Sequence, residues 1–303
     1  MGLMHEPQAN VDRPMNMVPV IRPSVPAPSA SLDAAHRLNR AAGMLAGSVL
    51  IDSAMEHYRG EFHNAAMWAP LVASSLSIAV SLHGQSDLRH GAHPGRDVIY
   101  AAAGLAGLVG TGFHIYNVTK KVGGFSWQNV FYRAPLGAPA ALSLSGLMGF
   151  LSERLRDNPP GRVPMIAGVD AGRVVAALTA VSLLGTTAEA GLLHFRGAFH
   201  NPAMLLPVTM PPVAAALLAC AAMARKGTPR PASHQWLAAT AVMGVAGVAL
   251  HTYGVSRGMG GWRNWRQNAF SGPPIPAPPA FTGLALAGLA ALALLGERHD
   301  DQA

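Results

Sequence analysis

HYRGEFHNAAM, residues 57–67, is followed 137 positions later by HFRGAFHNPAM, residues 194–204. Between residues 52 and 70 the two copies share nine identical residues, among them two histidines and an arginine. Packing of a protein core does not require this combination of polar residues in duplicate. The repetition therefore predicts a functional site that is built twice.

The similarity between the two halves extends well beyond these motifs. AAAGLAGLVGTGFHIYNV, from residue 101, matches AATAVMGVAGVALHTYGV, from residue 238, at the same offset, and PLGAPAA, from residue 135, matches PIPAPPA, from residue 274. Residues 1–34 are rich in Pro, Ser and Met, and we predict that they form a disordered tail. A first membrane repeat is expected at residues 35–158 and a second at residues 159–303.

The composition is that of a membrane protein. Half of the residues are apolar and only 12% are charged, against roughly 25% charged residues in soluble domains. Most of the apolar runs approach or reach the roughly 20 residues that a helix needs to cross a bilayer. We expect an all-α integral membrane protein with about eight transmembrane helices, at residues 41–58, 65–82, 98–118, 134–151, 172–195, 202–223, 235–255 and 280–296.

The number of spans fixes how the repeats are oriented. With four spans in each half, the second copy enters the membrane from the same side as the first, so the repeats are parallel. All repeated histidines then approach the membrane face opposite the termini. The terminus side carries 14 of the 22 Lys and Arg residues, which predicts cytoplasmic termini in a bacterial inner (plasma) membrane. The basic residues form no dense stripe, so nucleic acid is not an expected partner.

Part of the repeated motif has a structural interpretation. Gly60 and Gly197 follow the ends of predicted helices, where a left-handed C-cap favours glycine. Asn64 and Asn201 are expected N-caps of the following helices. The single cysteine, Cys220, lies in an apolar helix, where we expect it in the core, and it excludes an internal disulfide.

The residues that remain are candidates for chemistry, because ionisable groups in membrane spans are costly and usually functional. We expect a cofactor to be held by His57, His114, His194 and His251. The candidate metal ligands are the same four histidines with His63 and His200, and the last two are also candidate proton carriers. Arg59 and Arg196 would hold a propionate, a substrate anion or a deeper carboxylate.

Asp52 aligns with Glu189, so each half has an acid five residues before its first histidine. On an ideal helix the acid and the histidine lie about 140° and about 7.5 Å apart, too far to chelate one ion easily. A relay or supporting role in catalysis fits this spacing better. The structural alternative is a salt bridge from the acid to Arg59 or to a neighbouring span.

Two cofactors fit the histidines. Gly107 and Gly110 share a helical face with His114, as their repeats do with His251, and this face could admit a haem b with axial histidines. Close helix packing is the favoured explanation of these glycines. A transition metal, iron or copper, suits the same imidazoles. Met67 and Met204 lie four residues after His63 and His200 and could bind the same metal as these histidines. A lipid-facing position is commoner for methionine.

We expect a membrane redox protein or the membrane subunit of an oxidoreductase. It would hold haem or a metal near the non-cytoplasmic face, handle a quinone or another apolar molecule, and work with a partner redox subunit. The alternative is a proton- or ion-coupled transporter or channel that uses the duplicated histidines and acids. A scaffold helix bundle would leave the histidines unexplained. The repeated loops around Trp127 and Trp265 fit an interfacial aromatic belt, and their shared Gln and Asn could cover the site.

Overall fold

The computed structural model describes residues 30–133, 136–159, 162–224 and 230–300. Its described ranges contain eight long helices. In the first half these are α1 (Ala30–Arg59), α2 (Ala69–Ser86), α3 (Pro94–Thr119) and α5 (Gly137–Arg156). In the second half they are α6 (Ala171–Arg196), α7 (Leu206–Met223), α8 (Pro231–Ser256) and α10 (Pro279–Asp300).

Short elements join the long helices in a similar order in both halves. In the first half these are η1 (Ala65–Trp68), which leads into α2, and α4 (Trp127–Arg133), which precedes α5. In the second half they are η2 (Pro202–Leu205), η3 (Gly261–Asn264) and α9 (Trp265–Ser271). The strands β1 (Met165–Ile166) and β2 (Val169–Asp170) form a small antiparallel hairpin before α6.

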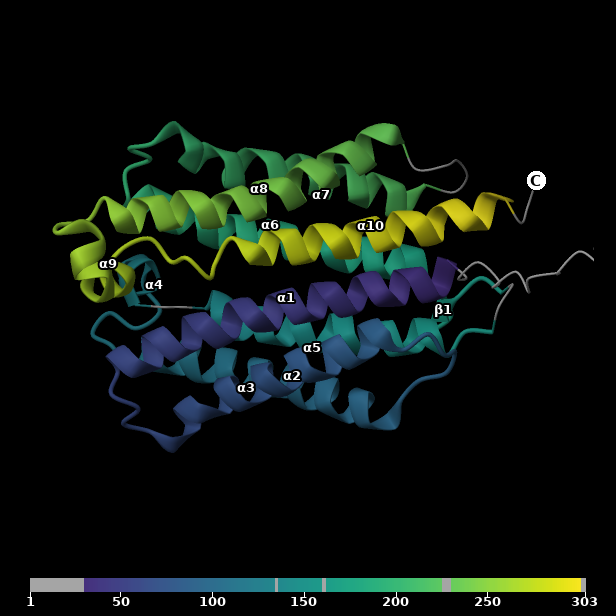
Figure 1. Ribbon diagram of the computed structural model, residues 1–303, viewed down its shortest axis with the longest axis horizontal. Helices are drawn as coiled ribbons and strands as arrows, with labels where there is room; N and C mark the ends of the chain where they lie inside the picture. Colours follow the sequence, from purple (N-terminus) through teal and green to yellow (C-terminus); the bar gives the residue numbers. More distant parts are fainter. Residues whose placement is uncertain (1–29, 134–135, 160–161, 225–229, 301–303) are drawn as a thin grey trace, which may run out of the picture.

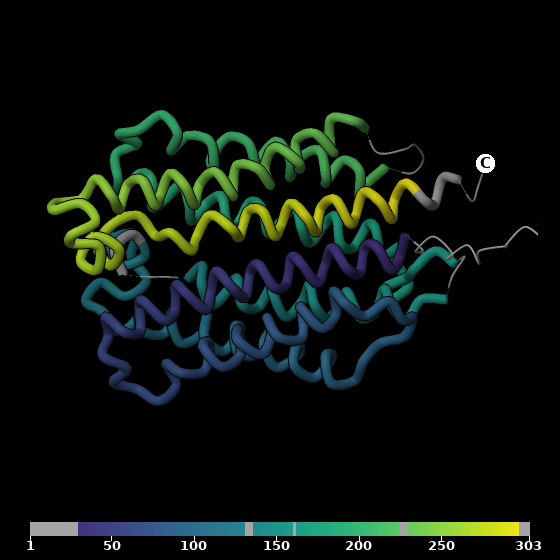
Figure 2. Tube along the Cα trace, viewed as in Figure 1, coloured from purple at the N-terminus to yellow at the C-terminus, as the bar shows by residue number. Residues whose placement is uncertain are grey.

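The long helices lie side by side in an elongated bundle. Helices α1 and α10 pack against each other along the boundary between the halves, with α2, α3 and α5 on one side and α6, α7 and α8 on the other (Figure 1). The start of α1 and the end of α10 lie at one end of the bundle (Figure 2). The short helices α4 and α9 lie at the opposite end.

Six helical segments are long and apolar enough to cross a membrane, and they include α2, α3, α6, α7, α8 and most of α10. Large apolar side chains such as Val72, Leu105 and Val242 are exposed on the outside of the bundle, where lipid would cover them. The chain is therefore an all-α protein of the membrane class. Helices α1 and α5 carry more polar residues, and many of these lie inside the bundle.

Two expectations about local structure need correction. Helix α1 begins at Ala30, so residues 30–34 are helical and not part of a tail, and Ala34 is fully buried against the bundle. The other residues of the predicted tail, 1–29, lie outside the described residues. Cys220 is exposed and not in the core, because its side of α7 faces away from the neighbouring helices.

Glycines let α3 approach α5, and α8 approach α10, very closely. A Cβ atom on Gly107 would overlap the backbone nitrogen of Ser143, and one on Gly244 would overlap the hydroxyl of Thr282. The favoured interpretation of these glycines as packing residues is confirmed. The face that a flat macrocycle would need is filled by α5 and α10.

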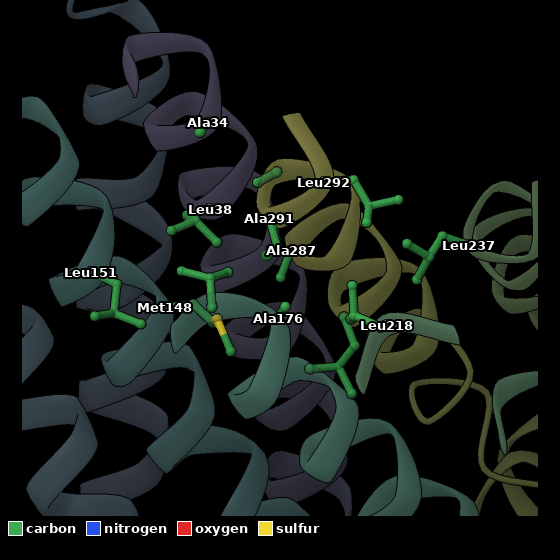
Figure 3. Close-up of a cluster of buried hydrophobic side chains, with 14 of the residues drawn as sticks. Ala34, Leu38, Met148, Leu151, Ala176, Leu218, Leu237, Ala287, Ala291 and Leu292 are labelled. Atoms are coloured by element: carbon green, nitrogen blue, oxygen red, sulfur yellow. The ribbon is translucent and has the colours of Figure 1, made fainter. Parts of the chain in front are cut away.

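The apolar core is continuous across the boundary between the halves. Figure 3 shows Leu38, Met148 and Leu151 of the first half beside Ala176 and Ala287 of the second. All five side chains are at most 4% exposed. The two halves therefore fold against a common core.

The first half also buries charged groups at the end of the bundle where α1 begins and α10 ends, which we call the terminus end. Arg96 donates to Asp87 Oδ2 at 2.8 Å and to Glu153 Oε1 at 2.8 Å, and Glu153 is fully buried. Arg156 donates to the Asp87 carbonyl at 2.6 Å. Hydrogen bonds from Arg89 and then from Arg96 hold the pKa of the Asp87 carboxyl well below its usual range. Each buried charge has a partner of opposite sign, as burial in a low-dielectric interior requires.

Gly146 on α5 provides a test of the close packing. A Cβ atom there would overlap the backbone nitrogen of Gly104 and the carbonyl of Tyr100. We expect Gly146→Ala to lower the free energy of unfolding by about 1–3 kcal/mol, the usual cost of overpacking. Gly112→Ala is the control, because nothing lies within 4 Å of its Cβ position. Thermal unfolding in detergent compares the two, and equal melting temperatures would contradict the packing.

Asp87 lies between α2 and α3, and its ionised form is favoured by folding. Because its folded pKa is below its unfolded value, its stabilisation is complete above the unfolded value near 3.8. That stabilisation is lost as the pH falls towards the folded pKa. We expect Asp87→Asn to melt at a lower temperature than wild type at pH 7 and the difference to shrink below about pH 4. A difference that stays constant with pH would show that the charge of Asp87 does not matter.

Candidate functional site

The two repeated motifs fold into the same loop. His57 Nδ1 lies 2.6 Å from the carbonyl oxygen of Met67, and His194 Nδ1 lies 2.8 Å from the carbonyl oxygen of Met204. A carbonyl only accepts hydrogen bonds, so Nδ1 carries the proton in both rings. In the neutral imidazole, Nε2 then has a free lone pair that can bind a metal ion or accept a proton.

The second histidine of each motif belongs to the loop itself. His63 Nδ1 donates to the carbonyl of Gly60 at 2.9 Å, and His200 Nδ1 donates to that of Gly197 at 2.9 Å. Both side chains are exposed. These bonds hold His63 and His200 against the turn, at the outer edge of the bundle.

The asparagines act as the sequence predicts. Asn64 Oδ1 accepts from the backbone nitrogen of Ala66 at 2.9 Å, and Asn201 Oδ1 accepts from that of Ala203 at 2.9 Å. They cap the short helices η1 and η2, which lead into α2 and α7. Their N-cap role is confirmed.

The prediction for the glycines is wrong in its geometry. Gly197 is the C-cap of α6, but its φ is −83°. The left-handed residues are the next two, Ala198 and Phe199 with φ of 55° and 46°, and their equivalents Glu61 and Phe62 with φ of 57° and 46°. The turn therefore stores strain in non-glycine residues.

The methionines explain why glycine precedes this turn. A Cβ atom on Gly60 would lie 3.0 Å from the terminal methyl of Met67, and one on Gly197 would lie 2.9 Å from that of Met204. Each methionine therefore packs on its glycine while its carbonyl binds the histidine. The methionines close the loop from the α2 and α7 sides.

The third histidine of each half comes from another helix and lies near the first. The rings of His194 and His251 are 6.4 Å apart and steeply inclined, at 72°. His251 Nδ1 donates to the carbonyl of Pro274 at 2.7 Å, so its Nε2 also keeps a lone pair. In the first half, His57 and His114 are close enough to interact electrostatically. Each half thus forms one histidine pair, defined here as His57/His114 and His194/His251.

The two repeated acids approach each other from opposite halves. Asp52 interacts electrostatically with Glu56 and with Glu189. Glu189 Oε1 accepts from the backbone nitrogen of Gly137 at 2.9 Å, at the start of α5. A helix N-terminus has unpaired N–H groups and favours a carboxylate. The acid of α6 therefore caps a helix of the other half.

The position equivalent to Gly137 is Pro276, which has no N–H to offer Asp52. Helix α1 contacts this residue through Ser48, whose hydroxyl donates to the Pro276 carbonyl. The two acids thus occupy related positions but have different hydrogen-bonding partners. Asp52 and Glu189 are not chemically equivalent.

The repeated arginines lie at the surface. Arg59 donates to Glu56 at 2.8 Å, and both side chains are about half exposed. Arg59 therefore pairs with Glu56, in the last turns of α1, and not with Asp52 as the structural alternative supposed. Arg196 is exposed at the end of α6. Both arginines remain candidates for binding an anion at this face of the protein.

The loops that precede α4 and α9 cover the same end of the bundle. Asn129 Nδ2 donates to the carbonyls of Val122 and Gly124, at 3.1 and 2.7 Å. Asn268 Nδ2 makes the equivalent bonds to Met259 and Gly261, at 3.2 and 3.0 Å. The shared asparagine therefore fixes the loop and is explained by structure alone.

A cleft of about 470 Å³ opens beside the first motif, between the two halves. It is lined by Tyr58, Arg59, Glu61, Phe62 and Phe270. Tyr58 stacks on Phe270 with ring centres 5.5 Å apart, and Arg266 donates to the Tyr58 hydroxyl. Aromatic and cationic groups from both halves meet here.

Within the described ranges, no three His, Cys, Asp or Glu side chains come close enough together to hold one metal ion. The fold brings together the first and third histidines of each half and leaves the second in the loop. Each pair brings two imidazole rings near each other. Comparisons of the chain with protein-family models, curated proteins and solved structures gave no match.

The left-handed turn residues can be tested by substitution. A non-glycine residue in this conformation costs about 1–2 kcal/mol, and the greater chain entropy of glycine offsets about 0.5–1 kcal/mol of the relief. We expect Glu61→Gly and Ala198→Gly each to raise the free energy of unfolding by about 0.5–1 kcal/mol. Ala216→Gly, on the exposed side of α7, should lower it. Destabilisation by all three substitutions would rule out strain in the turn.

Proposed function

We propose that the chain crosses the membrane eight times as two parallel four-helix repeats. The same order of long helices in each half supports this arrangement. Among the long helices that the structure describes, α1 and α5 are the two that are not apolar enough to cross a membrane by themselves. Burial between other helices would shield their polar residues from lipid. The excess of Lys and Arg at the terminus end supports cytoplasmic termini in a bacterial inner membrane.

We further propose that each histidine pair binds one transition-metal ion, in a membrane redox protein or the membrane subunit of an oxidoreductase. The observation that carries this proposal is the fixed orientation of the imidazoles. His57, His194 and His251 all donate Nδ1–H to a backbone carbonyl, which is the usual arrangement of metal-ligating histidines. Their Nε2 lone pairs are left for the metal.

The donor set favours iron or copper bound without a macrocycle. Imidazole nitrogens suit both metals. With metal–nitrogen bonds of about 2 Å, two rings 6.4 Å apart reach one ion when the two nitrogens lie on nearly opposite sides of it. A haem b beside Gly107 and Gly244 does not fit, because α5 and α10 occupy that face. A bound iron or copper ion would supply one-electron chemistry.

The residues of the chain have separate parts in this function. The backbone carbonyls of Met67, Met204 and Pro274 orient the imidazoles, and Asp52 and Glu189 would hold protons for the pairs. Arg59 and Arg196 would bind an anionic group at the surface, and His63 and His200 would exchange protons with solvent. A quinone or another apolar molecule and a partner redox subunit are the expected electron carriers.

Metal analysis of the purified protein tests this function. The affinity tag used for purification should contain no histidine. We expect about one iron or copper ion per histidine pair and an absorption or electron paramagnetic resonance signal that changes on reduction. His57→Ala and His194→Ala should each lose about half of the metal. His234→Ala, an exposed histidine of α8, should lose none. Background metal in wild type, or equal metal in all variants, would rule out the redox function.

A second function, proton- or ion-coupled transport, is favoured by one observation. Glu189 of the second half accepts a hydrogen bond from the Gly137 backbone nitrogen of the first half, so an ionisable group joins the two halves. Proton-coupled uptake in liposomes that disappears in Asp52→Asn, in a protein without bound metal, would select transport over redox chemistry.

A further inference from the structure

The core of the first half contains a polar column that the second half lacks. It begins at the terminus end with the ion pairs of Asp87, Arg96, Glu153 and Arg156. Next to them, the Tyr100 hydroxyl donates to Asn39 Oδ1 at 2.8 Å and lies 3.0 Å from the Ser81 hydroxyl. The hydroxyl of Ser152 lies 3.1 Å from the same Asn39 oxygen, and its shorter hydrogen bond, of 2.6 Å, goes to the Gly149 carbonyl.

The column continues one helical turn further into the bundle. The hydroxyls of Ser77 and Ser145 are 2.8 Å apart, and Ser145 donates to the Ala42 carbonyl at 2.8 Å. Both serines are fully buried. Hydrogen-bonding groups therefore extend from the terminus end into the interior of the first half, along α1, α2 and α5.

The same positions in the second half are almost entirely apolar. Asn39, Ser77, Ser81, Asp87, Tyr100, Ser145, Ser152, Glu153 and Arg156 align with Ala176, Ala214, Leu218, Ala224, Leu237, Leu284, Ala291, Leu292 and Leu295, and Arg96 aligns with Ser233. Figure 3 shows several of these apolar side chains packed together.

The packing at these positions is nevertheless equivalent in the two halves. A Cβ atom on Gly149 would overlap the Tyr100 ring, and one on the equivalent Gly288 would lie 2.7 Å from a methyl of Leu237. The helices therefore pack in the same way with or without polar groups. Replacing a buried ion pair by apolar residues is often neutral or stabilising, so stability does not account for the column.

Asn39 leaves one hydrogen-bonding group of the column unpaired. Its side chain is fully buried, yet Nδ2 has no hydrogen-bond partner among the residues that the structure describes. An unpaired buried amide costs about 1–3 kcal/mol. The first half therefore keeps an amide at the junction of Tyr100 and Ser152 at a cost in stability, whereas the second half has Ala176 at the same position.

An apolar layer separates the column from the first histidine pair. Val49, Ala103 and Leu142 form a second buried cluster, each at most 1% exposed. Along α1, Val49 lies between Ala42 of the column and His57, and along α3, Ala103 lies between Tyr100 and His114. Apolar constrictions of this kind gate membrane pathways by excluding water.

We propose that the polar column is a proton path that leads from the terminus face towards His57/His114 and is closed by the layer of Val49, Ala103 and Leu142. Each transfer moves one proton from one hydroxyl or water oxygen to the next, with no change in electron count. The ion pairs keep the entrance polar while their charges balance. The path itself does not depend on the proposed redox function. Only the identification of His57/His114 as the final proton acceptor rests on that function.

A smaller side chain in the apolar layer tests the proton path, because it would let water or protons cross the layer. The protein is reconstituted in liposomes that contain a pH-sensitive dye, and a potassium diffusion potential set with valinomycin drives protons inward. We expect Leu142→Ala to raise proton flux several-fold above wild type. The matched control is Phe281→Ala, the equivalent position of the second half, which removes a larger side chain where no polar column lies beneath. It should leave the flux near the wild-type value.

A second substitution shows whether the extra flux uses the column. Tyr100→Phe keeps the ring and removes the hydroxyl that links Ser81 to Asn39. Added to Leu142→Ala, it should return the flux most of the way to wild type. The proposal fails if Leu142→Ala conducts no better than wild type, if Phe281→Ala leaks equally, or if Tyr100→Phe changes nothing.

Metal content, measured on the same preparations, separates this proposal from the proposed redox function. Leu142→Ala and Tyr100→Phe should retain the metal of wild type. A wild-type protein without metal would contradict the redox function and leave the comparison of fluxes intact. Unchanged fluxes in a metal-loaded protein would contradict the proton path alone.

Discussion

Most polar groups inside an apolar helix bundle need hydrogen-bond partners within the protein, and this requirement orients the histidines and one acid of the candidate site. The imidazole Nδ1 of His57 and of His194 is satisfied by a backbone carbonyl beyond the turn. The carboxylate of Glu189 is satisfied by a helix N-terminus of the opposite half. Each solution fixes the orientation of a reactive group, so the requirement for hydrogen bonds also determines which atoms remain available for chemistry.

The sequence predicted the helical membrane class, the N-cap role of Asn64 and Asn201, and the packing role of Gly107. These features depend on local patterns that tertiary contacts do not override. It did not predict the left-handed residues, because Glu61 and Phe62 are residue types that rarely adopt this conformation. It also misjudged Cys220, since an apolar helix alone does not reveal which of its sides faces its neighbours.

Comparison of the repeats found the histidines but missed the polar column. Duplication singles out residues that the halves share, whereas Tyr100, Asn39 and Glu153 are informative because the second half replaced them. The aligned residues Leu237, Ala176 and Leu292 were already visible in the sequence. Their meaning required the structure, which places Tyr100 and Leu237 against equivalent glycines and so identifies a change of chemistry within unchanged packing.

The contrast between Gly137 and Pro276 has a consequence for how the molecule is observed. A perfectly duplicated protein would have two indistinguishable sites, and any spectroscopic probe would report one species. Here Glu189 has a backbone amide as partner, whereas proline stands at the matching place opposite Asp52. The electric fields at the two histidine pairs therefore differ. Probes at the two sites should give two resolved signals, each assignable to one half of the chain.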